Sequence, residues 1–340
     1  MAARVAVVGG GITGSVCASM LRAMGAEVKL FDKGGRLGGR ASGRVVASSG
    51  EPPLSFDHGV QFFRGQDPAL RPLLGSPLFA DLLAEWDGRF GVLGPRGGLL
   101  PTSAVRVALG ARGGSLLKDR AAPAASDPDG PAEYGSDVEQ QASDEDDEAA
   151  RSLAELDFCG FLEGEGPLLV GAAAAKSPWH ELCARTDVEV ATRTAVLDLA
   201  RSGGRWQLTT APVGEGGSPA VEEAFDHVVV ATHSSELGVA ALSHLLEEHT
   251  DEHSAPFVPA LTELVGKLQD LEREPVYTVM AGYEQALGAV PFEAAVPHGC
   301  TTLRWISRDS SKYAPADRPL QHLHMKQSSP DHCLFPLSLC

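Results

Sequence analysis

Residues 4–14, RVAVVGGGITG, contain the pattern that decides the fold of this chain. A short run rich in β-branched residues ends in three consecutive glycines, which predicts a strand followed by a tight turn. From Ile12 to Met24 apolar residues recur every four positions, as one face of a helix requires. The segment therefore predicts a strand, a tight turn and a helix in direct succession.

The residues after this helix predict a second strand parallel to the first. Gly25 follows the helix in the manner of a C-terminal cap, and residues 27–32, EVKLFD, alternate between polar and apolar side chains. Two strands joined by a helix within about 30 residues form a βαβ unit, and its strands lie side by side in parallel. We therefore expect an α/β fold built on a doubly wound parallel sheet.

Three glycines in the turn match the GxGxxG pattern of dinucleotide-binding proteins. Gly9 allows the tight turn, Gly11 lets the backbone approach a pyrophosphate, and Gly14 permits close packing of the helix on the strand. Asp32 ends the second strand, eighteen residues beyond Gly14, where a carboxylate accepts hydrogen bonds from a ribose. The pattern predicts an adenine-dinucleotide site and leaves NAD and FAD open. The remaining candidate contacts from this unit are Ile12, Thr13 and Lys33.

Two further segments favour FAD. Residues 34–40, GGRLGGR, resemble the continuation typical of the flavin amine oxidase superfamily, whose arginines run beside the FAD pyrophosphate. Residues 56–63, FDHGVQFF, are similar to a phrase in the renalase-like proteins of that superfamily. The resemblance implies FAD, with Gly59 placed so that the flavin ring lies against backbone. No terminal cysteine has the sequence context of a covalent flavin link, so the FAD is expected to be non-covalent. The cofactor contacts that the resemblance implies are Arg36, Gly39, Arg40, Asp57, His58, Gly59 and Gln61.

The resemblance continues, more weakly, to about Lys312. The similar stretches, in the family's order, are residues 168–171, 225–232, 277–284 and 303–312. Members of the superfamily usually end with a strand that carries a Gly-Asp pair, followed by a helix that approaches the flavin. Residues 313–340 contain no such segment and no clear periodicity. We therefore expect a truncated or alternatively spliced product with an incomplete flavin site and an unpatterned tail.

The family resemblance implies an FAD-dependent oxidoreductase that transfers a hydride from a small reduced substrate to the flavin, with dioxygen as acceptor. Renalase-like proteins imply dihydronicotinamide isomers as substrate, and the wider superfamily implies amines, polyamines or polyenes. The alternative is a non-catalytic truncated isoform that acts as a partial nucleotide-binding or partner-binding scaffold. Because the flavin itself accepts the hydride, no catalytic side chain is identified. Trp305 is expected on the substrate-cavity wall, and His58 is either close to the flavin or a structural hydrogen-bonder.

The formal charge of −17 comes largely from one segment. Residues 121–150 hold ten acidic residues and no Lys or Arg, and without them the balance is −7. Such a segment buries too little apolar surface to offset its ordering entropy, so we predict a disordered acidic insert. Since no basic cluster appears elsewhere, the composition argues against a nucleic-acid partner.

Cysteine spacing and hydropathy exclude several other classes. The six cysteines form no C-x-x-C pair and no metal-ligand spacing, so neither a zinc site nor a disulfide framework is indicated, and no metal is expected. No apolar run reaches the roughly 18 residues of a membrane span. We expect a soluble, cytoplasmic protein of undetermined oligomeric state, with an organelle left open if the N-terminus is incomplete.

The elements divide into two predicted domains. Residues 1–70 and 165–235 form a discontinuous FAD-binding domain that includes a β-meander with a turn at Gly203 and Gly204. Residues 71–164 and 236–312 form a second, α+β substrate lobe. Beyond the first βαβ unit, helices are predicted at residues 78–86, 178–185 and 261–271. Lys312 is expected to be a surface charge.

Overall fold

The computed structural model divides the chain into two compact units, residues 1–85 with 169–274 and residues 86–168 with 275–340. Each unit is described by itself, as unit 1 and unit 2. The described residues are 2–48, 51–65, 68–93, 99–101, 167–172, 177–214, 218–221, 224–233, 235–248, 258–271, 277–283, 290, 292–297, 303–312 and 321–327. The acidic segment 121–150, predicted to be disordered, lies outside them.

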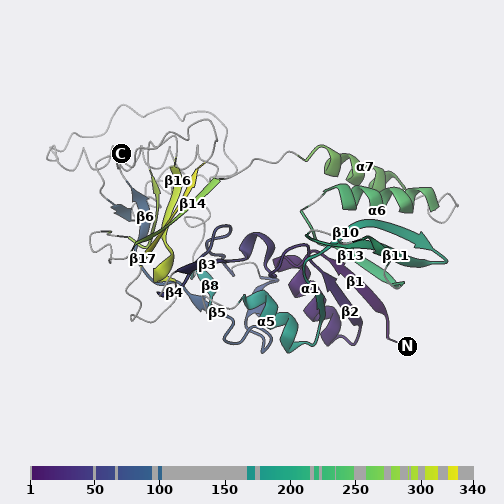
Figure 1. The fold of residues 1–340 in the computed structure, drawn as a ribbon, viewed down its shortest axis with the longest axis horizontal. Coiled ribbons are helices and arrows are strands. Elements are labelled where there is room, and N and C mark those ends of the chain that lie inside the picture. The colour runs from purple at the N-terminus through teal and green to yellow at the C-terminus, as the bar shows by residue number, and fades with distance from the viewer. Residues whose placement is uncertain are drawn as a thin grey trace, which may run out of the picture. The chain divides into compact units, whose positions relative to one another are not determined.

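Unit 1 is built on a parallel sheet in the order β13-β1-β2-β9 (Figure 1). Its strands are β1 (Arg4–Val8), β2 (Glu27–Phe31), β9 (Glu189–Ala191) and β13 (His227–Val230). Helix α1 (Ile12–Ala23) connects β1 to β2, and Gly25 with φ of 93° reverses the chain after it. These elements confirm the predicted βαβ unit and the α/β fold class.

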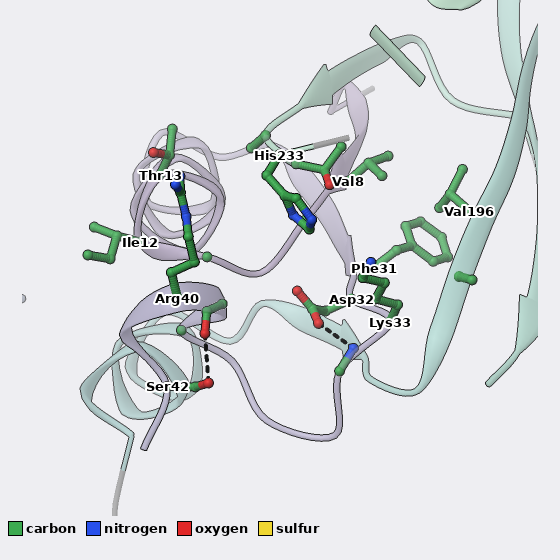
Figure 2. Close-up of a pocket in the computed structure, with 18 of the residues that line it drawn as sticks. Val8, Ile12, Thr13, Phe31, Asp32, Lys33, Arg40, Ser42, Val196 and His233 are labelled. Atoms are coloured by element: carbon green, nitrogen blue, oxygen red, sulfur yellow. Dashed lines mark hydrogen bonds between the residues drawn. The ribbon is translucent and has the colours of Figure 1, made fainter. Parts of the chain in front are cut away.

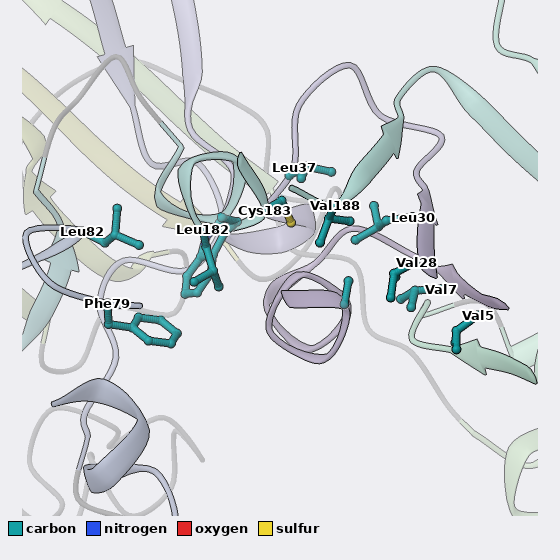
Figure 3. Packing of buried hydrophobic residues seen from close by; sticks show 12 residues of the cluster. Val5, Val7, Val28, Leu30, Leu37, Phe79, Leu82, Leu182, Cys183 and Val188 are labelled. Carbon is teal, nitrogen blue, oxygen red and sulfur yellow. The ribbon is translucent and has the colours of Figure 1, made fainter. Parts of the chain in front are cut away.

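Both faces of this sheet are covered. Because side chains alternate along a strand, Val5 and Val7 point to one face, where α1 packs with α5 (Pro178–Arg185) through buried Leu182 and Cys183 (Figure 3). Val8 points to the other face. There the β-meander packs through buried Leu199 and Leu208, together with buried Phe225, which precedes β13. Because elements cover both faces of the sheet, its central strands consist mainly of buried apolar residues.

The meander consists of β10 (Thr194–Ser202), β11 (Arg205–Pro212) and β12 (Ala220–Val221). Gly203 and Gly204, with φ of 58° and 77°, form the turn between its two long strands, as the sequence predicts. After β13 the chain forms α6 (Ser235–Glu248) and α7 (Val258–Gln269), which contact each other. Helix α7 covers most of the helix predicted at residues 261–271, and α6 was not predicted.

The helix predicted at residues 78–86 is wrong. The structure forms the short helix α2 (Arg71–Leu74), a series of turns, and then β5 (Leu83–Glu85), which pairs with β8 (Leu169–Gly171). Asp81 has a φ of 61°, a left-handed conformation that no α-helix interior contains. Phe79 and Leu82 are buried from these turns. The spacing of apolar residues in this segment therefore reflects which side chains are buried, although the backbone is not helical.

Two smaller elements of unit 1 lie between β2 and α2. The hairpin β3 (Arg44–Ser48) and β4 (Glu51–Phe56) is antiparallel. It follows a single turn of 3₁₀ helix, η1 (Gly39–Ala41), which belongs to the second glycine-rich motif. Together η1, β3 and β4 connect the parallel sheet to residues 57–61.

Unit 2 contains a mixed sheet in the order β14-β17-β16-β15-β6-β7. Its strands are β6 (Phe90–Leu93), β7 (Leu99–Pro101), β14 (Tyr277–Tyr283), β15 (Ala294–Pro297), β16 (Leu303–Arg308) and β17 (Gln321–Gln327). Strand β17 corrects the expectation of an unpatterned tail at residues 313–340, since it pairs with both β14 and β16. Leu323 and Met325 alternate with polar residues, which is the period of a strand.

The unit boundaries differ from the predicted domain boundaries. Helices α6 and α7 belong to unit 1, whereas the sequence pattern predicts residues 236–312 in the second lobe. The reason is a tertiary contact, because α6 packs against β10 of the meander. Within the described residues, no helix is both long and apolar enough to cross a bilayer.

Candidate dinucleotide-binding site

A cavity of about 900 Å³ lies in unit 1 at the carboxyl ends of β1, β2 and β13. Ligands of open α/β sheets bind at this edge, and the volume suits a cofactor-sized molecule. The cavity is lined by Val8, Gly9, Gly11, Ile12, Thr13, Phe31, Asp32, Lys33, Gly34, Arg36, Gly38, Gly39, Arg40, Ala41, Ser42, His58, Gly59, Val60, residues 194–197, Ala231, Thr232, His233, Glu236, Leu237 and Ala240 (Figure 2).

The three glycines of the first motif differ in what surrounds them. Gly9 has a φ of 105°, and a Cβ there would lie 2.7 Å from the carbonyl oxygen of Ala231. A Cβ on Gly14 would lie 1.8 Å from the carbonyl oxygen of Gly9, whereas a Cβ on Gly11 would meet nothing within 4 Å. The fold itself thus requires Gly9 and Gly14. Gly11 keeps open a space that belongs to the cavity.

Helix α1 begins at this open space. Gly11 is its N-cap, no side chain caps the helix, and its first turn contains no acidic residue. The first N–H groups of an α-helix have no partner within the helix, and the helix dipole places partial positive charge there. An anion such as a pyrophosphate is stabilised at this position without a basic side chain.

Asp32 holds the two glycine-rich loops together. Its Oδ2 accepts a hydrogen bond of 2.6 Å from the backbone N–H of Gly10, and its Oδ1 accepts one of 2.6 Å from Gly34. Each carboxylate oxygen has a second lone pair, so the group remains able to accept a hydroxyl hydrogen from a ribose. Asp32 therefore organises the site besides lining it.

The GGRLGGR motif packs directly on the first glycine motif. The backbone N–H of Gly38 donates a 2.7 Å hydrogen bond to the carbonyl of Gly10, and Gly38 has a φ of 119°. A Cβ on Gly39 would lie 3.2 Å from the Cα of Gly11. Buried Leu37 anchors the loop in the core of unit 1. The two motifs, which the sequence presents separately, form one cradle.

Three cationic side chains from residues 33–40 line the cavity: Lys33, Arg36 and Arg40. Figure 2 shows Arg40 directed toward Thr13 in the first turn of α1. Ser42 donates a 2.7 Å hydrogen bond to the carbonyl of Gly39 and closes the 3₁₀ turn that carries Arg40. Arginine offers several N–H donors in a planar fork, which suits phosphate oxygens.

The phrase at residues 57–61 divides into cavity-lining and structural residues. His58 and Gly59 line the cavity, and Asp57 and Gln61 do not. Gln61 is buried, and its Nε2 donates to the carbonyl of Asp57. A Cβ on Gly59 would lie 1.7 Å from the carbonyl oxygen of Arg40, so the fold requires a glycine there whether or not a ring lies against it.

Several lining residues were not among the sequence-predicted contacts. Residues 194–197 of β10 reach the cavity through tertiary packing, as do residues 231–233 after β13 and residues 236, 237 and 240 of α6. Leu237 and Ala240 give this wall an apolar face, and His233 and Glu236 give it polar groups. The signal in the sequence was the run at 227–232, since its carboxyl end meets that of β1 in a parallel sheet.

Two residues singled out in the sequence lie in unit 2. Trp305, on β16, is completely buried and does not line this cavity, and its place on a substrate-cavity wall stays a prediction. Lys312 was expected at the surface, which is wrong. Its side chain is fully buried and ion-paired with Asp309, with Nζ 2.9 Å from Oδ1. Its Nζ also lies 4.9 Å from the centre of the Trp86 ring.

The thiols in the described region have no features of reactive groups. Cys183 is buried between α1 and α5, and burial raises the pKa of its thiol despite hydrogen bonds with Ser19 and Ser15. Burial also raises the pKa of Cys17. Both side chains therefore stay protonated near neutral pH. Among the described residues, no group of three His, Cys, Asp or Glu forms a metal site.

Comparisons with known proteins agree with this geometry. Residues 7–76 match the family model of an NAD(P)-binding Rossmann-like domain. No curated protein matches significantly.

Several solved structures share the fold over nearly the whole chain. A protein of Exiguobacterium sp. 255-15, provisionally described as a protoporphyrinogen oxidase, has 16% identity and a TM-score of 0.54, covering 97% of this chain and 78% of its own. An oxidoreductase of Methanosarcina mazei has 15% identity and a TM-score of 0.58, with 96% and 80% covered. Putrescine oxidase bound to putrescine has 13% identity and a TM-score of 0.55, with 97% and 76% covered. At this identity the likeness establishes the fold: an α/β chain with a Rossmann-like domain.

Proposed function

We propose that this chain is an FAD-dependent oxidoreductase of the flavin amine oxidase superfamily. The observation that carries the proposal is the joining of the two glycine motifs around one cavity, through Asp32 and the hydrogen bond from Gly38 to Gly10. The GGRLGGR motif is the part of the cradle that resembles this superfamily. Structural neighbours described as protoporphyrinogen oxidase and putrescine oxidase support the same assignment.

The residues present fit a dinucleotide. The open space at Gly11 and the N-terminus of α1 suit the pyrophosphate, with Arg40 as an additional cation. Asp32 suits the ribose, and the apolar wall that includes Leu237 suits the adenine ring. Bound here without a covalent link, FAD would supply the hydride acceptor of the reaction.

The chain's own contribution is binding and orientation. The backbone N–H groups and cations of the cradle hold the phosphates, and Asp32 sets the distance between the two loops before a ligand arrives. Such preorganisation reduces the entropy lost on binding. No side chain in unit 1 needs to act as acid or base for hydride transfer, so no catalytic residue is assigned.

The proposed substrate is a small reduced molecule, with dioxygen as the final acceptor. The phrase FDHGVQFF resembles renalase-like proteins and favours dihydronicotinamide isomers. Amines are the competing class, because one structural neighbour is putrescine oxidase bound to putrescine. In this proposal unit 1 is the FAD-binding domain and unit 2 is the substrate domain.

Cofactor retention tests the first part of the proposal. The purified full chain is incubated with FAD and desalted, and the visible absorbance of the protein fraction is measured. We expect retained yellow flavin that bleaches anaerobically with a dihydronicotinamide isomer and recovers with dioxygen. Bleaching by an amine alone would contradict the renalase-like substrate. Loss of all flavin on desalting would contradict the flavoenzyme and favour the nucleotide-binding scaffold.

A further inference from the structure

His233 is a histidine in the cavity that neither glycine motif contains. It is the third residue after β13, and it lines the cavity together with residues of both glycine-rich loops. Figure 2 shows its imidazole directed into the cavity, which Thr13 of α1 and Asp32 after β2 also line. The ring therefore faces the space in which a dinucleotide would lie.

Backbone pairing fixes this position. Strand β13 is the parallel neighbour of β1, with Val230 opposite Val8. The backbone N–H of Ala231 donates a 2.8 Å hydrogen bond to the carbonyl of Val8, and the Ala231 carbonyl borders Gly9 closely. His233 therefore leaves the sheet beside the turn that leads into α1. The chain at this point is held by the sheet on one side and by α6 on the other.

The charged groups around His233 come from four segments. Of the two acids that line the cavity, Asp32 already accepts two backbone hydrogen bonds, and Glu236 lies in the first turn of α6. The titratable and charged side chains that line the cavity with His233 are Asp32, Lys33, Arg36, Arg40, His58 and Glu236. Figure 2 shows Arg40 directed toward the first turn of α1, and His233 lines the same cavity, so both side chains are available to a phosphate there.

We infer that His233 is an additional phosphate-binding residue of this site and makes dinucleotide affinity dependent on pH. The inference rests on the proposed nucleotide site. A protonated imidazole donates charge-assisted hydrogen bonds to pyrophosphate oxygens, which are stronger than those of a neutral ring. Imidazoles exchange this proton within the range of about pH 5 to 8. Because a neutral ring would lose the charge-assisted contact, the proposal predicts that affinity falls as pH rises.

The test uses the full chain and ADP-ribose, whose pyrophosphate is a diester without an ionisation in this range. Calorimetric titration between about pH 5.5 and about pH 8.5 gives the dissociation constant of the wild type and two variants. We expect wild-type affinity to fall roughly tenfold as pH rises, as the loss of a charged hydrogen bond predicts. His233→Gln binds weakly at every pH. His233→Lys binds tightly at every pH, because its charge persists.

Two controls separate this role from a structural one. His180→Ala removes an exposed histidine of α5 that does not line the cavity and leaves the pH profile unchanged. For adenosine, which lacks phosphate, the dissociation constant should not show the dependence on pH that His233 causes. Rescue by lysine excludes misfolding as the cause of weak binding in the glutamine variant.

The outcomes distinguish this inference from the proposed function. If the affinity for ADP-ribose falls with rising pH as steeply in His233→Gln as in the wild type, the role of His233 is overturned, even if FAD is retained. A slope that His233→Gln abolishes, in a chain that retains no FAD, supports the phosphate contact and contradicts the flavoenzyme. Failure of the wild type to bind either ADP-ribose or FAD overturns both.

Discussion

Charged side chains serve different purposes in the two units. In unit 1, Lys33 and Arg40 line a cavity, and the carboxylate of Asp32 binds backbone N–H groups at its edge. In unit 2, Asp309 and Lys312 bind each other and are completely buried. The charges of a buried pair neutralise each other and cannot reach a ligand. Charged side chains on an open cavity wall can contact one. The comparison therefore favours ligand binding as the proposed role of the first set, whereas separating the second pair should destabilise the fold.

The largest expected effect comes from breaking the buried pair. Lys312→Met leaves the Asp309 carboxylate buried without its cation, which costs about 3–5 kcal/mol of unfolding free energy. Urea unfolding of the full chain, followed by fluorescence, measures the loss. The double variant with Asp309→Asn should recover much of it, because no charge is then left unpaired. An unchanged unfolding curve for Lys312→Met would show that the pair is not formed in solution.

A smaller loss of stability is expected for Gly14→Ala. The added methyl group would lie 1.8 Å from the carbonyl oxygen of Gly9, so α1 must move away from the turn. Overpacking of this kind costs about 1–3 kcal/mol. The midpoint of thermal unfolding measures the effect, and a midpoint equal to that of the wild type would contradict the close packing of α1 on the turn.

Gly11→Ala is the matched variant, which should weaken ligand binding and leave stability nearly unchanged. Its methyl group meets no protein atom within 4 Å, and Gly11 has a φ of −69° that alanine readily adopts. Stability should change by less than about 1 kcal/mol, the cost of a poorer N-cap. If the pyrophosphate binds at Gly11 as proposed, the methyl group occupies its space, and affinity for ADP-ribose should fall by roughly tenfold or more. Equal affinity in the two proteins would mean that the ligand does not approach Gly11.

The smallest effect concerns acid stability. The backbone N–H of Arg4 hydrogen-bonds Asp226, and this bond, with the nearby Arg205 guanidinium, lowers the pKa of Asp226 below its usual 3.8. A lowered folded-state pKa contributes stability above the unfolded value, and that contribution is lost as pH falls through the folded value. Asp226→Asn should therefore reduce the thermal midpoint at neutral pH and matter less in strong acid. Asp198→Asn, at an exposed position of β10, is the control. A difference in thermal midpoint between wild type and Asp226→Asn that is the same at neutral pH and in strong acid would contradict the linkage.

Sequence patterns predicted the first βαβ unit well because its elements are local. The strand, turn and helix of the first βαβ unit lie within one continuous segment, and the fold requires Gly9 and Gly14 at a fixed spacing in it. The same patterns failed at residues 78–86. There Phe79 and Leu82 are spaced as on a helix, but Asp81 adopts a left-handed conformation and the apolar side chains reach the core from turns.

Other features depended on segments far apart in the chain. Strand β17 was overlooked because its seven residues are short of apolar side chains, and its place between β14 and β16 comes from pairing with both. Helices α6 and α7 belong with the parallel sheet because α6 contacts β10. Periodicity reports which face of an element is buried, and it does not report which partner covers that face.

The sequence by itself determined the GxGxxG turn, Asp32 after the second strand and the GGRLGGR loop, because backbone dihedral angles and the spacing of side chains are local properties. Only the tertiary structure joined the two glycine loops through Asp32, brought His233 to the wall of the cavity, and buried Lys312 beside Asp309. These relations link residues separated along the chain or depend on the surroundings of a side chain. Burial and contact across the fold decided them, and no local pattern encodes either.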